Sequence, residues 1–289
     1  MMNTNLILII LATVWIASCT PDDSPADSWQ RVETTGEGTI LLYYVASDGF
    51  AYYDNGNNLT GVTADIFYDF VNWIENTYGY EITLQKENIE SWSHFYNTVK
   101  ESPSGIFGMG NVTITDERWK EIDFSPPYMT NIAVLITNKE TEELSSPETI
   151  AGEFAHLRAL AFEGTLHEER INYFRDEFYP ELQIDFAHSN NEIIEQVASD
   201  NKYFAYVDVY NYWRAREAGV PLRRHGIADE PSEQFGYILP NNSDWTPIIT
   251  RFFEEGDGYV NTAPYREIMV THLGTELAQL LEEARLNSE

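Results

Sequence analysis

The sequence has little positive charge and almost no cysteine. Its 289 residues include 17 Lys and Arg against 47 Asp and Glu, a formal net charge of −30. Contact with phosphates needs clustered basic side chains, so we expect no nucleic-acid partner. The single cysteine excludes a disulfide within the chain and a cysteine-based zinc site. The six histidines lack metal-ligand spacing, so no metal site is expected.

Hydrophobic residues make up 43% of the chain and aromatic residues 14%, enough to bury a sizeable core, and the length allows about two ordinary domains or one large one. Short apolar runs typical of strands alternate with amphipathic segments typical of helices. This alternation predicts an α/β fold on a mostly parallel sheet. The predicted strands are 39–45, 81–84, 132–136, 157–161, 203–207 and 237–239, and two predicted helices are 64–78 and 92–99.

The N-terminal segment has the pattern of a targeting signal. No charged side chain precedes Cys19, and the apolar run 6–17 is shorter than the roughly 20 residues that a membrane-spanning helix needs. Residues 16–19, Ile-Ala-Ser-Cys, resemble the bacterial lipobox. We therefore predict a lipoprotein signal peptide at 1–18 and lipidation at Cys19; the alternative is an ordinary signal peptide whose cysteine is incidental.

The residues after Cys19 are polar and include prolines, which is typical of a flexible linker. Residues 19–38 are therefore predicted to be a tether. The mature protein is expected to lie in the periplasm or at the cell surface, held to the membrane by its lipid.

Three later segments resemble the periplasmic polar-amino-acid-binding proteins, which are the solute-binding components of ABC importers. The most specific spans 110–128, where Gly-Asn-Val-Thr-Ile-Thr-Asp-Glu-Arg is followed by Asp-Phe-Ser-Pro-Pro-Tyr. The others are 59–65, similar to the family's sequence before its first long helix, and the pair 164–165 followed by 206–208.

The resemblance implies a type II periplasmic-binding-protein-like fold, in which two α/β lobes enclose a cleft and are joined by two crossing strands. We place the crossings near 135–138 and 234–239. Lobe one is then 39–136 plus 239–289, and lobe two is 137–238. Ligand contacts divided between the lobes would shift the open–closed balance towards the closed state.

The residues near Arg118 predict a carboxylate site. Thr115 followed by two acids indicates a helix start, with Arg118 in its first turn. The Thr113 hydroxyl and the fork of the Arg118 guanidinium could bind an α-carboxylate. The alternative is a capped helix whose Arg118 merely pairs with a neighbouring acid; the resemblance favours ligand binding.

Gly164 and Thr165 precede a second predicted helix, where Thr165 and Glu168 fit a capping box and free N–H groups could bind an anion. In the family the equivalent pair donates to the same carboxylate, although the pair could also cap a helix that touches no ligand. Asp208, after an apolar strand, matches the family's acid for the ligand ammonium. Asp48, after the first strand, is the candidate in lobe one.

Phe50, Tyr52 and Tyr53 could stack on the ligand side chain, or belong to the core. Asn111 stands where the family usually has Gly or Ser, which changes the hydrogen bonding expected there. The predicted ligand-binding set is Arg118, Thr113, Asn111, Thr165, Gly164, Asp208, Asp48 and Phe50.

The resemblance implies a monomeric, non-catalytic protein that captures an amino acid or similar small carboxylate for an ABC permease, without a cofactor. The sequence contains no P-loop, zincin or nucleophile-elbow motif. Two alternatives remain: a dehydratase-like enzyme of the same fold, with an acid such as Glu163 in the cleft, and a sensory lipoprotein that feeds no importer.

Overall fold

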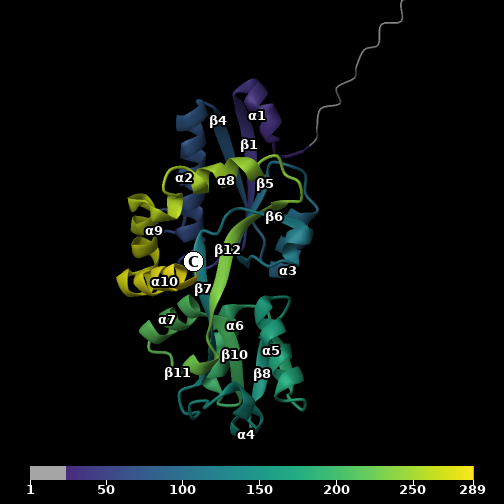
Figure 1. Cartoon of the computed structure of the whole chain (residues 1–289), viewed down its shortest axis with the longest axis vertical. Coiled ribbons are helices and arrows are strands. Elements are labelled where there is room, and N and C mark those ends of the chain that lie inside the picture. The colour runs from purple at the N-terminus through teal and green to yellow at the C-terminus, as the bar shows by residue number, and fades with distance from the viewer. Residues whose placement is uncertain (1–23, 289) are drawn as a thin grey trace, which may run out of the picture.

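The computed structural model describes residues 24–288, which form two α/β lobes stacked along the long axis of the molecule (Figure 1). A single sheet of ten strands runs through both lobes. Its main order is β4-β1-β5-β12-β7-β10-β8-β9, with β11 beside β7 and β6 beside β12. The predicted two-lobed α/β fold is confirmed, although the sheet is mixed because its two central strands pair antiparallel with their neighbours.

The first lobe is built on three parallel strands, with β1 (Glu37–Tyr44) between β4 (Glu81–Asn88) and β5 (Ile106–Thr113). Its long helix α2 (Val62–Tyr78) buries Ile66, Phe67, Phe70 and Ile74 on one face, as the apolar spacing predicts. The other elements of this lobe are β2 (Tyr52–Tyr53), β3 (Leu59–Thr60), α3 (Trp92–Lys100), η1 (Arg118–Lys120), β6 (Ile122–Phe124), α8 (Thr246–Glu254), η4 (Tyr259–Asn261), α9 (Ala263–Leu273) and α10 (Thr275–Ser288).

The second lobe has a smaller parallel core, in which β8 (Arg158–Phe162) lies between β10 (Tyr203–Asp208) and β9 (Ile184–Ala187). The helices α5 (Leu166–Glu177), α6 (Asn190–Ser199) and α7 (Val209–Glu217) pack against these strands. Each strand therefore ends next to the start of a helix. The remaining elements are η2 (Pro147–Thr149), α4 (Ile150–Glu153), β11 (Leu222–Arg224) and η3 (Gly226–Ala228).

Two strands, β7 (Met129–Asn138) and β12 (Glu230–Pro240), cross between the lobes. β7 pairs with β12 as far as Ala133, where it begins to pair with β10 of the second lobe. β12 pairs with β5 of the first lobe from Phe235 onward. The change of partner at Ala133 comes two residues before the predicted 135–138, whereas that at Phe235 falls within the predicted 234–239. The burial pattern of β7 could not mark the crossing, because all ten residues of the strand are buried.

Sequence reading did not find β5, although this strand lies within the most specific motif. Its apolar run is interrupted by Gly108 and Gly110. A Cβ on Gly108 would lie 2.9 Å from Phe95 Cζ, and one on Gly110 would lie 2.7 Å from Phe95 Cε1. The two glycines are therefore the result of close packing between α3 and the strand, which hides the strand from a search for apolar alternation.

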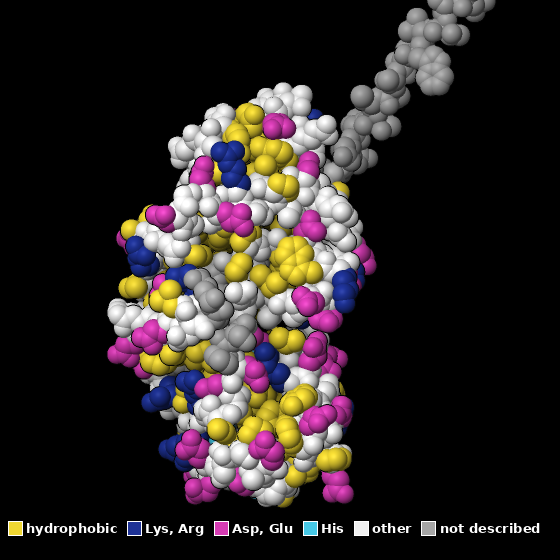
Figure 2. All heavy atoms as spheres, viewed as in Figure 1, with side chains coloured by type: hydrophobic (Ala, Val, Ile, Leu, Met, Phe, Trp, Pro, Cys, Tyr) yellow, Lys and Arg dark blue, Asp and Glu magenta, His cyan; other side chains and the backbone are white. Residues whose placement is uncertain are grey.

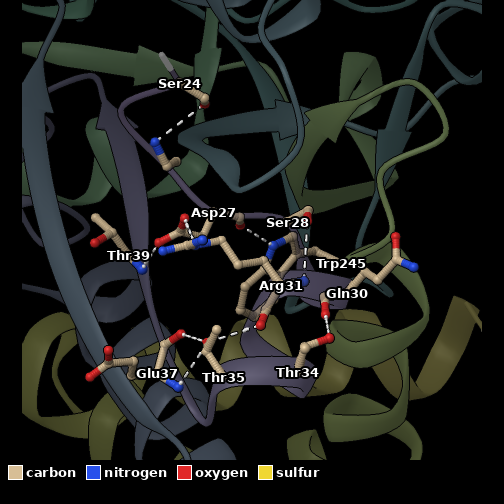
Figure 3. A network of polar contacts seen from close by, with 11 residues as sticks. Ser24, Asp27, Ser28, Gln30, Arg31, Thr34, Thr35, Glu37, Thr39 and Trp245 are labelled. Atoms are coloured by element: carbon tan, nitrogen blue, oxygen red, sulfur yellow. Dashed lines mark hydrogen bonds and ion pairs between the residues drawn. The ribbon is translucent and has the colours of Figure 1, made fainter. Parts of the chain in front are cut away.

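The predicted tether is wrong for residues 24–38, because this segment packs on the first lobe. The helix α1 (Trp29–Thr35) buries Trp29 and Val32, and Ser28 Oγ caps it by accepting from Arg31 N at 3.3 Å. Figure 3 shows how Asp27 joins this segment to the lobe: its carboxylate accepts from Thr39 N at 2.8 Å, and its carbonyl accepts from Trp245 Nε1 at 2.9 Å. The predicted signal peptide and Cys19 lie outside the described residues.

Acidic side chains are distributed over both lobes on the face drawn in Figure 2, rather than gathered in one patch. No helix within residues 24–288 is long and apolar enough to cross a membrane. On this face the acidic composition therefore forms no local patch that would mark a binding site, and the groups that line a cavity are the place to look for one.

Candidate ligand-binding cleft

A cavity of about 510 Å³ lies between the lobes beside the crossing strands. Its lining includes Ser47 and Arg118 from the first lobe, Thr165 and Asp208 from the second, and Glu233 from β12. This volume falls in the usual range for small-molecule sites. The cleft is therefore the candidate binding site.

Arg118 lines the cavity with a charge that no protein acid neutralises directly. Its guanidinium donates from Nη1 to the Thr113 carbonyl at 2.8 Å, and among residues 24–288 no carboxylate lies within 4.0 Å of it. Burial lowers the pKa of Arg118 from its ordinary value. The simple alternative, in which Arg118 pairs with a neighbouring acid, does not apply to this geometry.

The local backbone differs from the predicted helix start. Arg118 begins a single 3₁₀ turn of three residues, η1, and not an α-helix. Thr115 Oγ1 does accept from Arg118 N at 3.2 Å, so the predicted capping contact forms without the helix. A turn of this length has no appreciable macrodipole, so its dipole does not hold the acids that precede it.

The Arg118 guanidinium lies over two aromatic rings of α3, Trp92 at 5.2 Å and Tyr96 at 5.8 Å. The rings stack on each other with centroids 5.5 Å apart, and we call the pair the aromatic shelf. Tyr96 donates its hydroxyl to Glu121 at 2.9 Å, and Glu121 is paired with Lys100. Cation–π contact holds a guanidinium without neutralising it, so the shelf positions Arg118 and leaves its charge for a ligand.

On the opposite side of the cleft, the start of α5 is only partly as predicted. Thr165 is the N-cap residue and lines the cavity, but its hydroxyl donates to the Phe162 carbonyl at 2.8 Å. Glu168 accepts from Gly164 N at 2.8 Å, so the predicted reciprocal box with Thr165 does not form. Gly164 is not part of the lining, and its amide is already used by Glu168.

Asp208 belongs to a buried network at the crossing strands, which we call the hinge acid cluster. Asn131 Nδ2 donates to Asp208 Oδ1 at 2.6 Å and to Glu233 Oε2 at 2.7 Å. Arg170 Nη2 donates to Glu233 Oε1 at 2.5 Å. The exposed fractions of Asp208 and Glu233 are 8% and 6%. The members of the cluster are Asn131, His167, Arg170, Asp208 and Glu233.

The protonation state of His167 follows from its partners. Arg170 Nη1 lies 3.2 Å from His167 Nδ1, and a guanidinium can only donate, so Nδ1 accepts. The ring proton is then on Nε2, which lies 3.4 Å from Asp208 Oδ1. His167 is therefore neutral, and with both carboxyl groups ionised the hinge acid cluster carries a net charge of about −1.

Asn111 and Tyr210 connect the lobes at the wall of the cavity. Asn111 adopts a left-handed backbone (φ 52°), donates to Tyr210 Oη at 3.1 Å and accepts from Tyr128 Oη at 2.9 Å. Ser47 Oγ lies 3.3 Å from the same Tyr210 oxygen. Burial raises the pKa of Tyr128 and of Tyr210. The side-chain amide of Asn111 thus forms hydrogen bonds within the protein. The Gly or Ser that the family usually has at this position would not have this amide.

The remaining predicted residues have different positions. Asp48 lines the cavity and pairs with Arg214 of the second lobe at 3.1 Å, in an exposed contact between the lobes. Phe50 is not part of the lining; its buried ring packs 4.3 Å from that of Tyr210, in the core. Tyr52 does line the cavity, and Tyr53 is exposed.

Sequence reasoning missed Glu233, Asn131, His167 and Trp92. Glu233 and Asn131 lie on the crossing strands in a stretch without a recognised motif, so only their apposition in the fold shows their role. His167 follows the recognised Thr165 by two residues, and a polar residue in the first turn of α5 was the available signal. Within the described part of the chain, no group of three or more His, Cys, Asp or Glu side chains could hold a metal ion.

A cavity between two lobes, with a cationic side chain from one lobe and buried acids beside the crossing strands, defines a two-lobed ligand-binding protein. Residues 43–255 match the family model of the bacterial extracellular solute-binding proteins, family 3, and the chain belongs to this family. Among curated protein sequences, none matches it.

Solved structures share the fold. An ABC uptake transporter substrate-binding protein from Streptococcus pneumoniae with bound histidine is 16% identical, with a TM-score of 0.65 over 86% of this chain and 96% of that one. The arginine-, lysine- and histidine-binding protein ArtJ from Geobacillus stearothermophilus is 18% identical, with a TM-score of 0.63 and coverages of 82% and 96%. An ancestral amino-acid-binding protein, a precursor of cyclohexadienyl dehydratase, is 18% identical, with a TM-score of 0.60 over 84% of this chain and 98% of that one.

Proposed function

We propose that this protein binds a free amino acid in the interlobe cleft and delivers it to an ABC importer. Arg118 binds the α-carboxylate with the fork of its guanidinium, and Thr113 lies beside it. Asp208 accepts hydrogen bonds from the α-ammonium. One observation carries this proposal: a cation without a carboxylate partner and a buried cluster with excess negative charge line the same cavity, as the two ends of a zwitterion require.

The contacts between the lobes suit a closed, ligand-holding state. Tyr210 of α7 bonds to Asn111 of β5, and Arg214 pairs with Asp48. A ligand held by Arg118 on one side and Asp208 on the other would add its own contacts to these, and so favour the closed state over the open one. A permease that recognises the closed state would then accept only the loaded protein.

We propose further that the protein is a lipoprotein outside the cytoplasm, anchored through Cys19. The motivation is the lipobox-like sequence before the chain's one cysteine. The segment from residue 24 onward packs on the first lobe, so residues 19–23 would be the link to the anchor. Labelling of growing cells with a radioactive fatty acid should mark the wild-type protein and leave Cys19→Ser unmarked; equal labelling of the two would remove this assignment.

Binding is tested by thermal unfolding of the purified protein against the twenty proteinogenic L-amino acids. A ligand at a hundredfold excess over its dissociation constant should stabilise the protein by about 2.7 kcal/mol. The bound compound should be recovered unchanged after long incubation. If no amino acid raises the melting temperature, the amino-acid assignment is wrong; if the compound is consumed, the protein is an enzyme.

The acid considered from sequence for such an enzyme does not reach the cavity. Glu163 is exposed and lies 3.0 Å from His188 Nδ1, outside the cavity lining. A proton donor for an elimination would have to act from within the cleft. Glu163 is therefore not that donor, but Asp208 and Glu233 do line the cleft, so recovery of the bound compound unchanged is the observation that separates binding from catalysis.

A further inference from the structure

We propose that Glu233 is a second acceptor for the cationic group of the ligand and makes the cleft select amines over otherwise identical hydroxy acids. The inference rests on the amino-acid function proposed above and extends it to a residue on a hinge strand. Glu233 lines the cavity together with Asp208, and both carboxylates bond to the same Asn131 nitrogen. The two acids are thus parts of one subsite.

The hydrogen bonds of this subsite leave acceptors in excess. Asn131 Nδ2 uses both of its hydrogens on the two acids, whereas the buried Asn131 Oδ1 has no partner within the described part of the chain. Among the described residues, Asp208 Oδ2 accepts no hydrogen bond either. An ammonium brings three donors and no acceptor, so it supplies what the subsite lacks. A hydroxyl brings only one donor, so most of these acceptors would still lack a hydrogen-bond donor.

The charges point to the same ligand group. Arg170 neutralises one of the two carboxylates, and His167 is neutral because its Nδ1 accepts from Arg170. One negative charge therefore remains at two side chains that are less than a tenth exposed. Burying an unpaired charge is costly, and a ligand cation placed beside both acids would offset that cost.

Because Glu233 lies on a strand that joins the lobes, a ligand bound to it would also affect the hinge. Asn131 lies on β7 and Glu233 on β12, the two strands that join the lobes, whereas Asp208 ends β10 of the second lobe. An ammonium held by both acids would therefore contact the second lobe and the crossing segment together. Its binding would restrain the hinge directly, in addition to bridging the lobes through Arg118.

The test compares Glu233→Gln with the wild type by calorimetric titration of two probes. The probes are the amino acid that gives the largest thermal shift and its 2-hydroxy acid, in which a hydroxyl replaces the ammonium. We expect Glu233→Gln to weaken amino-acid binding at least tenfold and to change hydroxy-acid binding less than about threefold, so that selectivity falls. Glu230→Gln removes an exposed acid of the same strand outside the cavity, and should leave both affinities within twofold.

A purely structural role for Glu233 gives a different pattern. If Glu233 serves only as the counter-ion of Arg170, its removal should weaken both probes equally and leave selectivity unchanged, and Glu233→Gln with Arg170→Gln should restore the wild-type affinity for both probes. Either result would overturn the proposal, which predicts that the double variant still discriminates less than the wild type. If the wild type binds no amino acid at all, the proposed function itself fails, which is a separate outcome.

Discussion

The two ends of the cleft hold their charges in opposite ways. At one end Arg118 lies on two aromatic rings and donates to a backbone carbonyl, and no carboxylate of residues 24–288 is in contact with it. At the other end Asp208 and Glu233 are surrounded by donors, yet keep one charge in excess. Arg118 keeps its positive charge available because its partners are uncharged. The acid end keeps a negative charge because Arg170 pairs with only one of its two carboxylates. Neutralisation of either end within the protein would remove its use for a zwitterion.

The ends also differ in how they are assembled. Thr113, Thr115 and Arg118 are close in sequence, and the aromatic shelf comes from the neighbouring α3. The hinge acid cluster instead draws on β7, α5, β10 and β12. The first end is therefore a local structure completed by one helix, whereas the second exists only when both lobes and both crossing strands are in place.

The largest expected effect comes from removing the cation. Arg118→Ala leaves the α-carboxylate of the ligand in a cleft that holds buried acids, so affinity should fall at least ~100-fold. The melting temperature of the free protein should change little, because within the described part of the chain Arg118 forms no ion pair. Calorimetric titration measures the first effect and thermal unfolding the second.

Arg214→Ala is the matched control, since Arg214 also lines the cavity but is exposed and paired with Asp48. A surface pair contributes about 1 kcal/mol or less, so this variant should lose under about fivefold in affinity. Equal losses in the two variants would mean that the cleft responds only to total positive charge, and that Arg118 is not a specific clamp.

This difference in assembly explains what could be predicted from sequence. Arg118, Thr113 and Asp208 line the cavity, and they could be proposed from sequence because each lies in or next to a motif or at the end of an apolar strand. Glu233 and Asn131 could not be found, because their meaning comes from the pairing of β7 with β12 across about a hundred residues. Phe50 was placed in the site by its distance from β1, but its side chain points into the core against Tyr210.

The same reasoning covers the fold. Most strands with continuous apolar runs were predicted to within about four residues at each end, but 237–239 covers only the end of β12. β5 was hidden by glycines that packing against Phe95 requires. Residues 24–38 read as a tether because they are polar and contain proline, yet Trp29 and Val32 give α1 one apolar face. Two apolar side chains are enough to pack a seven-residue helix on the lobe. Their contribution is lost when the composition of the whole segment is averaged.

A second prediction concerns the loss of folding stability at low pH through His225, a residue of the second lobe. His225 is fully buried there; its Nδ1 accepts from Leu144 N at 3.0 Å, and its Nε2 lies 2.8 Å from Thr137 Oγ1. Burial and the positive charge of Arg223 lower the pKa of His225 from 6.5 to about 4. The unfolded chain therefore binds this proton first, and folding stability falls as the pH drops below 6.5 towards 4.

The loss from this group alone should be about 2 kcal/mol between pH 7 and pH 5. Urea unfolding of the ligand-free protein at the two pH values measures it. His225→Asn keeps an acceptor for Leu144 N but cannot be protonated, so it should be less stable at pH 7 and lose about 2 kcal/mol less on acidification. An unchanged pH dependence in this variant would show that another group controls the acid response.

The smallest expected effect is the loss of affinity on removing the Tyr96 hydroxyl, which should change the Arg118 end of the cleft and leave the acid end unchanged. Tyr96→Phe keeps both rings of the aromatic shelf and removes only the hydroxyl that donates to Glu121. Arg118 would then lie on a less firmly held ring, and affinity should fall by about two- to fivefold, the scale of one net hydrogen bond. This loss should be the same for an amino acid and for its 2-hydroxy acid, because both present the same carboxylate to Arg118. Tyr173→Phe, at an exposed position of α5, should change neither affinity. A loss confined to the amino acid would mean that the aromatic shelf acts on the hinge acid cluster rather than through the carboxylate bound by Arg118.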